Sequence, residues 1–172
     1  MKTKLVPIDS VYPDPANVRQ HPEPNLAAIR ASLARFGQQK PIVIDSKGVI
    51  RAGNGTHAAA VALGWDKIGV VVSDLAGVDA VAYAIADNRT SELATWDEVA
   101  LAETLRSLQS EEDFPLEATG FTAEEVDALI AGLAEEIAEE PSPLEEFPEA
   151  DETLETLYRC PKCDYRWSGS PK

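Results

Sequence analysis

The stretch that decides the fold runs from Ile50 to Leu63 and reads Ile-Arg-Ala-Gly-Asn-Gly-Thr-His-Ala-Ala-Ala-Val-Ala-Leu. Two glycines, Gly53 and Gly55, separate a short apolar segment from an alanine-rich run with high helix propensity. This order predicts a strand, a tight turn and the N-terminus of a helix. The first N–H groups of a helix have no intrahelical partner and the helix dipole is positive there, so such a turn suits a phosphate. The simpler alternative is that the glycines only let the chain turn.

Strands and helices alternate on both sides of this turn, which predicts an α/β or α+β domain with a small mixed sheet over residues 1–97. Upstream, a hairpin turn at 46–48 leads into the glycine turn. Downstream, 68–72 is the most β-branched run of the chain and predicts a central strand. The other expected elements are a first strand within 3–12, a helix with Asn25 as its N-cap that ends at Gly37, a strand at 41–45, and a helix over 78–86 that ends at the polar tetrad Asp87-Asn88-Arg89-Thr90.

Three further segments are expected after this domain: a helical extension over 98–138, an acidic linker over 139–156 and a zinc-knuckle-like C-terminus over 157–172. The second helix of the extension begins at Thr122, with a capping box that Glu125 completes. Its apolar stripe favours packing onto the first domain, or onto a second copy, over a dedicated partner helix. The linker contains prolines and has no sustained periodicity.

Charge is unevenly spread along the 172 residues, whose net charge is −15. Residues 1–100 hold ten basic and eleven acidic side chains, whereas 101–172 hold five and nineteen. Phosphate contacts need Lys and Arg, and the near-neutral N-terminal part leaves room for a local basic face. The sequence has neither an apolar run long enough to span a bilayer nor the apolar core of a signal peptide. We therefore expect no membrane partner and a cytoplasmic location.

The two cysteines of the chain, Cys160 and Cys163, are separated by two residues, with a proline between them and aromatic residues on both sides. This spacing predicts a zinc knuckle. Tetrahedral zinc needs four ligands, so the other two would come from a second copy of the chain or from a partner protein. The alternatives are a redox pair, which would need a thioredoxin-like context that is absent here, and a metal-free remnant.

Five short motifs follow one another in the order Asn17-Val18-Arg19, Phe36-Gly37-Gln38, Pro41-Ile42-Val43, Ala52-Gly53-Asn54-Gly55-Thr56 and Ala86-Asp87-Asn88-Arg89. Taken together, this ordered set resembles the ParB/sulfiredoxin superfamily, and most closely the ParB-like nuclease domains of phages and mobile elements. The resemblance covers roughly residues 1–97. The following Trp96-Asp97 and Thr119-Gly120-Phe121 resemble the end of the ParB-like module that precedes a DNA methyltransferase in relatives.

This resemblance implies that the chain binds a nucleoside triphosphate together with a bridging magnesium ion. Asp87 and Asn88 would hold the magnesium, for which a carboxylate oxygen is a suitable ligand. Gln38 would lie near the reacting end, and Gln38 and Asp87 are the candidate catalytic residues. The implied phosphate contacts are Arg19, Gly53, Asn54, Gly55, Thr56, His57, Asn88 and Arg89.

The chain departs from the family pattern at the turn itself. Partition proteins typically have Gly-Glu-Arg-Arg where this chain has Gly53-Asn54-Gly55-Thr56. Asn54 cannot serve as a general base, and two cationic phosphate contacts are missing. The essential cysteine of sulfiredoxins is absent from this loop, which excludes sulfinic acid reduction. The helices expected between 98 and 140 are acidic and no helix-turn-helix is visible in them, so we expect no sequence-specific binding to a partition site.

Three functional hypotheses follow. The first is a ParB-like protein of a phage or mobile element that binds a nucleotide or nucleic-acid phosphates through the Gly53–His57 turn, with magnesium-dependent nucleotide hydrolysis or DNA nuclease activity as its candidate chemistry. The second is a non-catalytic adaptor that recruits a DNA methyltransferase or another DNA-processing enzyme. The third is a small-molecule kinase of the serine type. The expected partners are DNA or a nucleotide, a DNA-modifying enzyme, and a second copy of the chain that shares one zinc ion.

Overall fold

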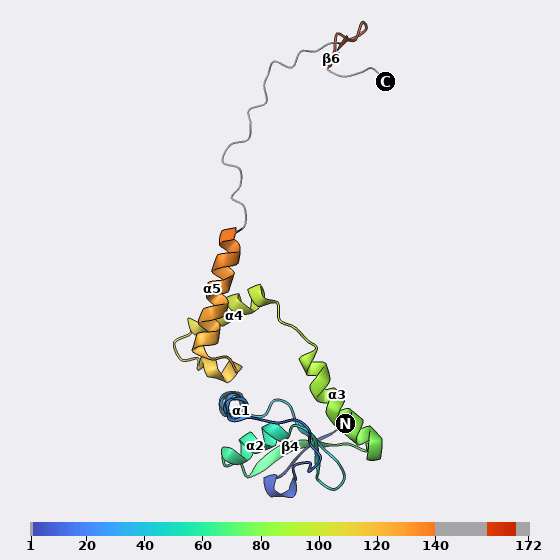
Figure 1. Ribbon diagram of the computed structural model, residues 1–172, viewed down its shortest axis with the longest axis vertical. Helices are drawn as coiled ribbons and strands as arrows, with labels where there is room; N and C mark the ends of the chain where they lie inside the picture. The colour runs from blue at the N-terminus through green and yellow to red at the C-terminus, as the bar shows by residue number, and fades with distance from the viewer. Residues whose placement is uncertain (1, 140–157, 168–172) are drawn as a thin grey trace. The chain divides into compact units, whose positions relative to one another are not determined.

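The computed structural model of the chain describes residues 2–139 and 158–167. The chain divides into two compact units, Met1–Ile137 and Ala138–Lys172, which are described separately. The first unit contains a four-stranded mixed sheet with helices, and residues 158–167 of the second form a short hairpin (Figure 1). This confirms the predicted mixed α/β fold. The predicted domain boundary at residue 97 stays a prediction, and the predicted linker lies outside the described residues except for its first residue, Glu139.

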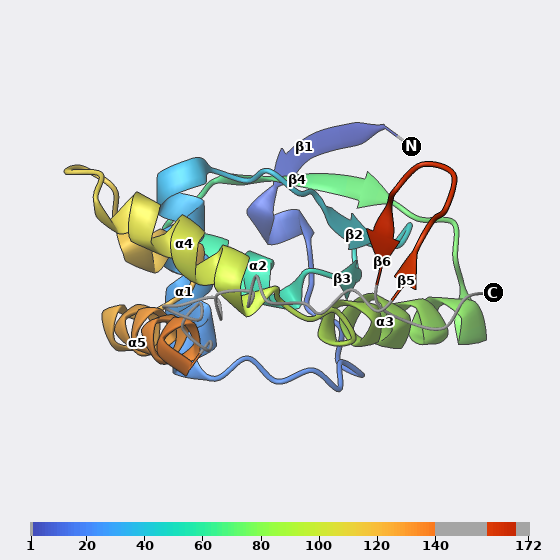
Figure 2. The ribbon, with the colours of Figure 1, turned by 90° about the horizontal axis from the view of Figure 1, so that it is seen from above.

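The sheet has the strand order β1-β4-β2-β3. Strand β4 runs parallel to β2 and antiparallel to β1, and β3 pairs with β2 as the second strand of a hairpin (Figure 2). The β-branched run therefore forms an inner strand, as its composition predicts. The strands are β1 (Thr3–Pro7), β2 (Ile42–Ile44), β3 (Ile50–Ala52) and β4 (Lys67–Val72).

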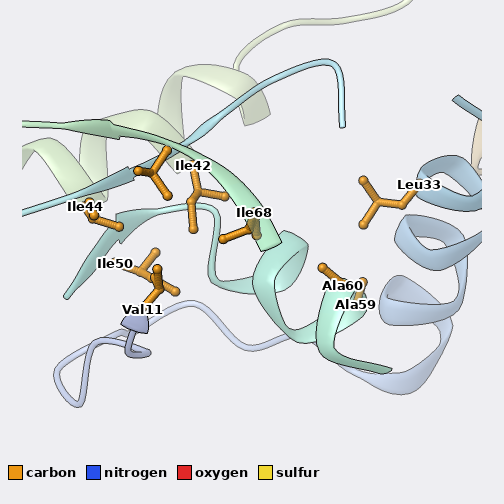
Figure 3. Packing of buried hydrophobic residues seen from close by; sticks show 9 residues of the cluster. Val11, Leu33, Ile42, Ile44, Ile50, Ala59, Ala60 and Ile68 are labelled. Carbon is orange, nitrogen blue, oxygen red and sulfur yellow. The ribbon is translucent and has the colours of Figure 1, made fainter. Parts of the chain in front are cut away.

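The hydrophobic core joins this sheet to helices α1 (Glu23–Phe36) and α2 (Asn54–Ala62) (Figure 3). Ile50 and Ile68 from the strands are fully buried, as are Ala59 and Ala60 of α2. Alanine side chains are small, so they let α2 lie close to the strands. Burying an aliphatic side chain contributes about 1.5–3 kcal/mol, and the core depends on several such residues.

Helix α1 begins earlier than predicted. Its N-cap is Pro22 rather than Asn25, and the Leu26 N–H donates to the Pro22 carbonyl at 3.1 Å. Proline is tolerated in the first turn because the N–H groups there have no helical partner. Asn25 Oδ1 instead accepts a hydrogen bond from His21 Nδ1 at 2.8 Å. The helix ends at Gly37, whose φ is 68°, as predicted.

Helix α3 (Gly77–Glu92) continues beyond its predicted end, so the polar tetrad lies inside the helix and not after it. The Asn88 Nδ2 group donates to the Ala84 carbonyl at 2.8 Å, and the Thr90 hydroxyl donates to the Ala86 carbonyl at 2.8 Å. These bonds satisfy the polar side chains within the helix, which is a recognised arrangement for such residues in the middle of a helix.

Two further helices and a 3-10 turn complete the first unit. Helix α5 begins with the predicted capping box: the Thr122 N–H donates to Glu125 Oε2 at 2.8 Å, and the Glu125 N–H donates to Thr122 Oγ1 at 3.2 Å. The 3-10 turn lies against α1, so the extension packs onto the sheet-bearing part of the unit. None of the helices in the described ranges is long and apolar enough to cross a membrane. The elements are α4 (Glu98–Gln109), η2 (Leu116–Thr119) and α5 (Ala123–Glu139).

The fully buried position of Ile50 gives a stability prediction. We expect Ile50→Ala to lower the free energy of unfolding by about 2–5 kcal/mol, because it removes buried methyl groups and leaves a cavity. Ile85→Ala on α3 is the matched control, since Ile85 is 52% exposed, and we expect a change within about 0.5 kcal/mol. Urea unfolding followed by circular dichroism measures both. Equal losses in the two variants would contradict the placement of the core.

Candidate functional site

A cleft of about 220 Å³ lies where three segments of the first unit meet. The segments are the N-terminus of α2, the loop that leads into α1, and helix α3 near Asp87; strand β2 and the residues just before it complete the wall. Pockets that enclose a whole drug-sized ligand usually measure roughly 300–1,000 Å³. The cleft therefore has room for one end of such a ligand rather than for all of it.

The space around the turn requires glycine at both positions, and at Gly53 the backbone conformation requires it as well. Gly53 has φ 101°, in the left-handed region, and a Cβ atom there would lie 2.5 Å from Ile42 Cγ2. A Cβ atom on Gly55 would lie 2.8 Å from the ring of His21 and 3.0 Å from Ile29 Cδ1. The glycines thus allow α2 to approach β2 on one side and the loop before α1 on the other.

The N-terminus of α2 forms one wall of the cleft. Helix α2 starts at Asn54, and its N-cap is Gly53, which has no side chain to cap the helix. The N–H groups of Asn54, Gly55 and Thr56 belong to the first turn, where no intrahelical carbonyl is available to accept from them. All three residues line the cleft, which therefore receives the positive end of the helix dipole.

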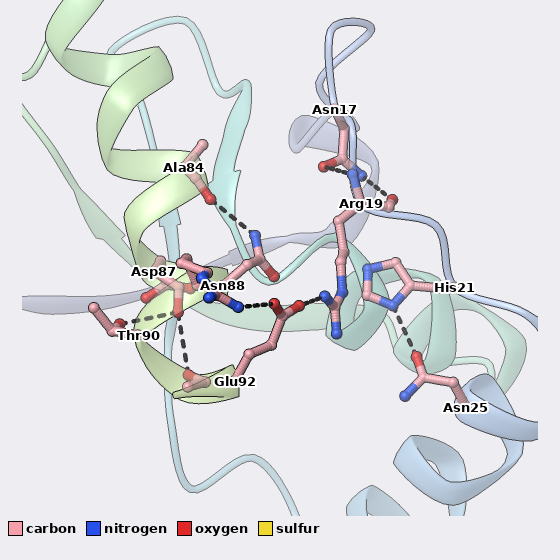
Figure 4. A network of polar contacts seen from close by, with 11 residues as sticks. Asn17, Arg19, His21, Asn25, Ala84, Asp87, Asn88, Thr90 and Glu92 are labelled. Carbon is pink, nitrogen blue, oxygen red and sulfur yellow. Dashed lines mark hydrogen bonds and ion pairs between the residues drawn. The ribbon is translucent and has the colours of Figure 1, made fainter. Parts of the chain in front are cut away.

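Cationic side chains add to this positive end. Arg19, Lys40 and Arg51 line the cleft, together with His21. The Arg19 guanidinium forms an ion pair with Glu92, the last residue of α3, and thereby connects the loop to that helix (Figure 4). The Arg19 side chain is 45% exposed, so the pair is open to solvent and worth little by itself.

Arg51 is held more firmly than Arg19. Its two terminal nitrogens donate to Asp14 Oδ2 at 2.6 Å and to Asp45 Oδ2 at 2.8 Å, and both carboxylates are only 12% exposed. These bonds fix the Arg51 side chain between the loop and the β2–β3 hairpin. The Nε atom of Arg51 is buried without a hydrogen-bond partner in the part of the chain that the structure describes.

The pKa of Asp45 reflects this position. Burial acts most strongly and would raise the pKa, but hydrogen bonds from the Val49 N–H, the Arg51 guanidinium and the Lys47 N–H outweigh it, so the pKa lies below its usual value. The pKa of Arg51 is raised, first by its hydrogen bond to Asp45. Both groups are therefore charged at neutral pH.

The Asn54 side chain is bound to the same loop. Its Oδ1 atom accepts a hydrogen bond from the Asp14 N–H at 3.3 Å. This bond joins the first residue of α2 to the residue that also pairs with Arg51. Asn54 therefore connects the glycine turn to the loop that carries Arg19, and an amide at this position supplies no general base.

Helix α3 contributes Asp87 and Asn88 to the opposite wall. Because the Asn88 Nδ2 group is bonded to the Ala84 carbonyl, the amide group turns its oxygen away from that bond (Figure 4). Two neighbouring side chains at this wall thus offer oxygen atoms, one from a carboxylate and one from an amide. Asp87 is the acidic residue among those that line the cleft.

The structure brings together most of the residues that the sequence indicates, namely Arg19, Gly53, Asn54, Gly55, Thr56, Asp87 and Asn88. Three others do not line the cleft. Gln38 Oε1 accepts from the Gly69 N–H at 2.6 Å and Gln38 Nε2 donates to the Gly69 carbonyl at 2.9 Å, so its amide holds β4. His57 is 7% exposed, with Nε2 3.4 Å from the Ile8 carbonyl. Arg89 is exposed and pairs with Glu92 at 3.4 Å.

Sequence reasoning missed the three basic side chains of the cleft besides Arg19, namely His21, Lys40 and Arg51. A local signal existed for Arg51 alone, because it lies two residues before Gly53 in a strand of alternating burial. Lys40 reaches the cleft because it precedes β2, which borders α2. His21 reaches it because the loop before α1 passes over Gly55. These placements depend on tertiary contacts.

The structure provides few metal ligands at either of the two predicted metal sites. No group of three or more His, Cys, Asp or Glu side chains suited to a metal ion occurs within residues 2–139 and 158–167. Asp87 and Asn88 line the cleft as a pair, and Cys160 and Cys163 are free cysteines of the C-terminal hairpin. Within the described ranges, each place thus supplies two side chains that suit a metal ion.

Comparisons with known proteins show similarity to a curated protein. The chain is 37% identical over 73 residues to the ParB-like nuclease domain-containing protein YnaK of Escherichia coli (strain K12), a match that covers 41% of this chain and 84% of the relative. Among solved structures, the C-terminally truncated chromosome-partitioning protein ParB from Caulobacter crescentus, complexed with CTP-gamma-S, matches with a TM-score of 0.67 and 19% identity. That match covers 78% of this chain and 79% of the ParB chain, and it shows a shared fold.

Residues 99–156 match the sequence model of the ParB-methyltransferase HTH domain. The expectation that no helix-turn-helix is present between 98 and 140 is therefore wrong, since the match covers α4 and the described part of the chain up to the end of α5. Because these helices are acidic, sequence reasoning did not recognise a helix-turn-helix in them. The predicted likeness of this segment to a module that accompanies DNA methyltransferases agrees with the match.

The lowered pKa of Asp45 predicts how stability depends on pH. The Asp45 carboxylate stabilises the fold at any pH above its unfolded pKa of about 3.9, and this contribution is lost as the pH falls through the lower folded pKa. We expect Asp45→Asn to have a lower free energy of unfolding than the wild-type chain at about pH 6. This difference in free energy should narrow towards about pH 3. Urea unfolding across this range measures the difference. Asp74→Asn, at an exposed position, is the control for loss of charge, and a difference for Asp45→Asn that is independent of pH would contradict the prediction.

Proposed function

Since the chain belongs to the family of ParB-like nuclease domain proteins, we propose that it binds a nucleoside triphosphate, with the phosphates at the N-terminus of α2. The observation that carries this proposal is the cleft itself. Three N–H groups without intrahelical partners and three cationic side chains converge on it. The likeness in fold to a ParB structure that contains CTP-gamma-S supports the same choice of ligand.

Arg51 supports an oxygen-rich ligand in a second way. A buried donor without a partner costs about 1–3 kcal/mol, and the Nε atom of Arg51 is such a donor within the described residues. Phosphate oxygens in the cleft are acceptors that would satisfy it. The other nitrogens of Arg51 stay bonded to Asp14 and Asp45, so this guanidinium is held in place before the ligand binds.

We further propose that Asp87 and Asn88 hold magnesium when the nucleotide is present. Magnesium is usually bound through one or two protein oxygens, with waters and substrate phosphates completing its shell. A carboxylate and an amide oxygen on the wall opposite the α2 N-terminus fit this description. The ion would supply positive charge to the phosphates when it is bound.

Binding is better supported than hydrolysis. Asn54 cannot act as a general base, and the amide of Gln38 is committed to the backbone of Gly69. Asp87 is the carboxylate that lines the cleft, and it has the magnesium role in this proposal. A protein that binds a nucleotide and releases it slowly, or without cleavage, fits these side chains.

A specific observation favours a second candidate, the adaptor. Over residues 98–139 the chain has twelve acidic side chains and one basic side chain, Arg106. Phosphate contacts to DNA depend on Lys and Arg, so this segment suits a basic protein surface better than a nucleic acid. Its match to the ParB-methyltransferase HTH domain makes a DNA-modifying enzyme the appropriate partner to test. This function needs no cleft, so it remains the better candidate if no nucleotide binds.

Isothermal titration calorimetry with CTP and the other nucleoside triphosphates, with and without magnesium, tests the proposal. We expect Arg19→Ala to weaken binding roughly 10- to 100-fold, because a hydrogen bond to a charged group contributes about 1.5–3 kcal/mol. Arg30→Ala, on α1 and paired with Glu23, is the matched control and should bind like the wild-type chain. No heat of binding for any triphosphate would contradict the proposal, and an equal loss for Arg89→Ala would contradict the placement of Arg89 outside the cleft.

Removing the charge of Glu92 should have the opposite effect on nucleotide binding. The Glu92 carboxylate pairs with Arg19 and would compete with phosphate for that guanidinium. We expect Glu92→Gln to tighten nucleotide binding by up to about fivefold, since an exposed ion pair is worth about 0.2–1 kcal/mol. Glu103→Gln on α4 removes the same charge at an exposed position and controls for the overall field. Weaker binding by Glu92→Gln would show that Glu92 positions Arg19 instead.

A further inference from the structure

The C-terminal hairpin brings the two cysteines of the chain together in one turn. Strands β5 (Tyr158–Arg159) and β6 (Arg166–Trp167) pair antiparallel, and the turn between them contains Cys160 and Cys163. The Cys160 N–H donates to the Tyr165 carbonyl at 2.8 Å, and the Asp164 N–H donates to the Cys160 carbonyl at 3.0 Å. These bonds close the turn around the first cysteine.

The two sulfur atoms lie next to each other. The Cys163 thiol contacts the Cys160 sulfur, which also accepts hydrogen bonds from the backbone N–H groups of Lys162 and Cys163. Both cysteines are free. Two cysteines in one tight turn can bring two thiols to one side of a metal ion, as they do in a zinc knuckle.

The hairpin is too small to be stable by its own packing. Each strand has two residues, and the aromatic rings of Tyr158, Trp167 and Tyr165 stack on one another, with ring centroids 5.8 and 6.3 Å apart. A two-stranded hairpin is marginal in water, and folded pieces of this size usually need a disulfide, a metal or a partner subunit. The free thiols leave a metal or a second subunit to supply that stability.

The described residues of one chain do not complete a zinc site here. The sequence has two cysteines, and the described ranges contain no group of three or more potential metal ligands. The Asp164 carboxylate is already paired with Arg159. Of the two histidines, His57 is buried and His21 is bonded to Asn25 beside the cleft. The described residues therefore supply two ligands, and a tetrahedral site needs two more.

A second copy supplies what is missing. Two hairpins provide four thiolates, the set found in many structural zinc sites. Four thiolates around Zn²⁺ carry a net charge of −2, and each hairpin has three cations, Arg159, Lys162 and Arg166, against one carboxylate. This local positive charge is unusual in so acidic a chain, and it favours thiolates from two copies at one point.

We propose that the hairpin is half of a zinc site, and that two copies of the chain are joined by one Zn²⁺ bound to Cys160 and Cys163 of each. Four thiol protons are released as four Zn–S bonds form, and no oxidant or reductant takes part. The site serves to hold two chains together. The site uses no residue of the nucleotide cleft. The proposal is therefore tested independently of the proposed function.

The test uses the full chain, stripped of metal by a chelator and kept in a thiol-free reductant. Zinc is then added, and metal content and mass are measured by elemental analysis and native mass spectrometry. We expect a dimer with one zinc ion per two chains, which a chelator returns to monomer. Cobalt in place of zinc should give the visible absorption of a tetrahedral thiolate site. One zinc per monomer, no bound zinc, or a dimer that ignores the chelator would each overturn the proposal.

Substitutions distinguish the loss of the zinc site from the loss of the fold. Cys160→Ser and Cys163→Ser should each lose both the bound zinc and the dimer, whereas Lys162→Ala, between the cysteines, should keep both because the backbone N–H remains. Circular dichroism shows whether the first unit stays folded in each variant. A Cys163→Ser chain that still dimerises with zinc would overturn the proposal, and the stoichiometry of the wild-type chain tests it even if a variant misfolds.

Discussion

A single close approach, between the backbone at Gly53 and the side chain of Ile42, sets the position of α2. Gly53 is in the left-handed region, and a Cβ atom there would lie 2.5 Å from Ile42 Cγ2. The turn is therefore restricted to glycine by conformation and by space together. Because α2 starts at the next residue, its unpaired N–H groups are directed to the cleft, and Ala59 and Ala60 are set against the core.

A second set of contacts fixes the other side of the cleft. Asp14 pairs with Arg51, and its N–H donates to Asn54, so one residue of the loop is bonded to both β3 and α2. Asp45 holds the second nitrogen of Arg51 from the β2–β3 hairpin. Partly buried charges that are paired on both sides resist rearrangement, because removing one partner would leave an uncompensated charge. Arg19, further along the loop, keeps more freedom through its exposed pair with Glu92.

Local patterns were enough to predict the mixed sheet, the inner strand at Lys67–Val72 and the glycine turn before α2. These features depend on hydrophobic alternation and turn chemistry, which involve only residues that are close together in the sequence. They could not tell on which side of a helix a polar side chain lies. His57 follows the cleft residues by one position, and a step of about 100° turns it into the core. The same step along α3 turns Arg89 away from the cleft that Asn88 lines. Gln38 bonds to Gly69, 31 residues later, which no local pattern reveals.

The proposed function requires phosphates to bind to the first N–H groups of α2. Nuclear magnetic resonance of the ¹⁵N-labelled chain tests it most directly, by titration with a nucleoside triphosphate and, separately, with the nucleoside alone. We expect the amide signals of Asn54, Gly55 and Thr56 to move most, and only with the triphosphate. Shifts confined to other parts of the chain, or equal shifts with the nucleoside, would contradict it.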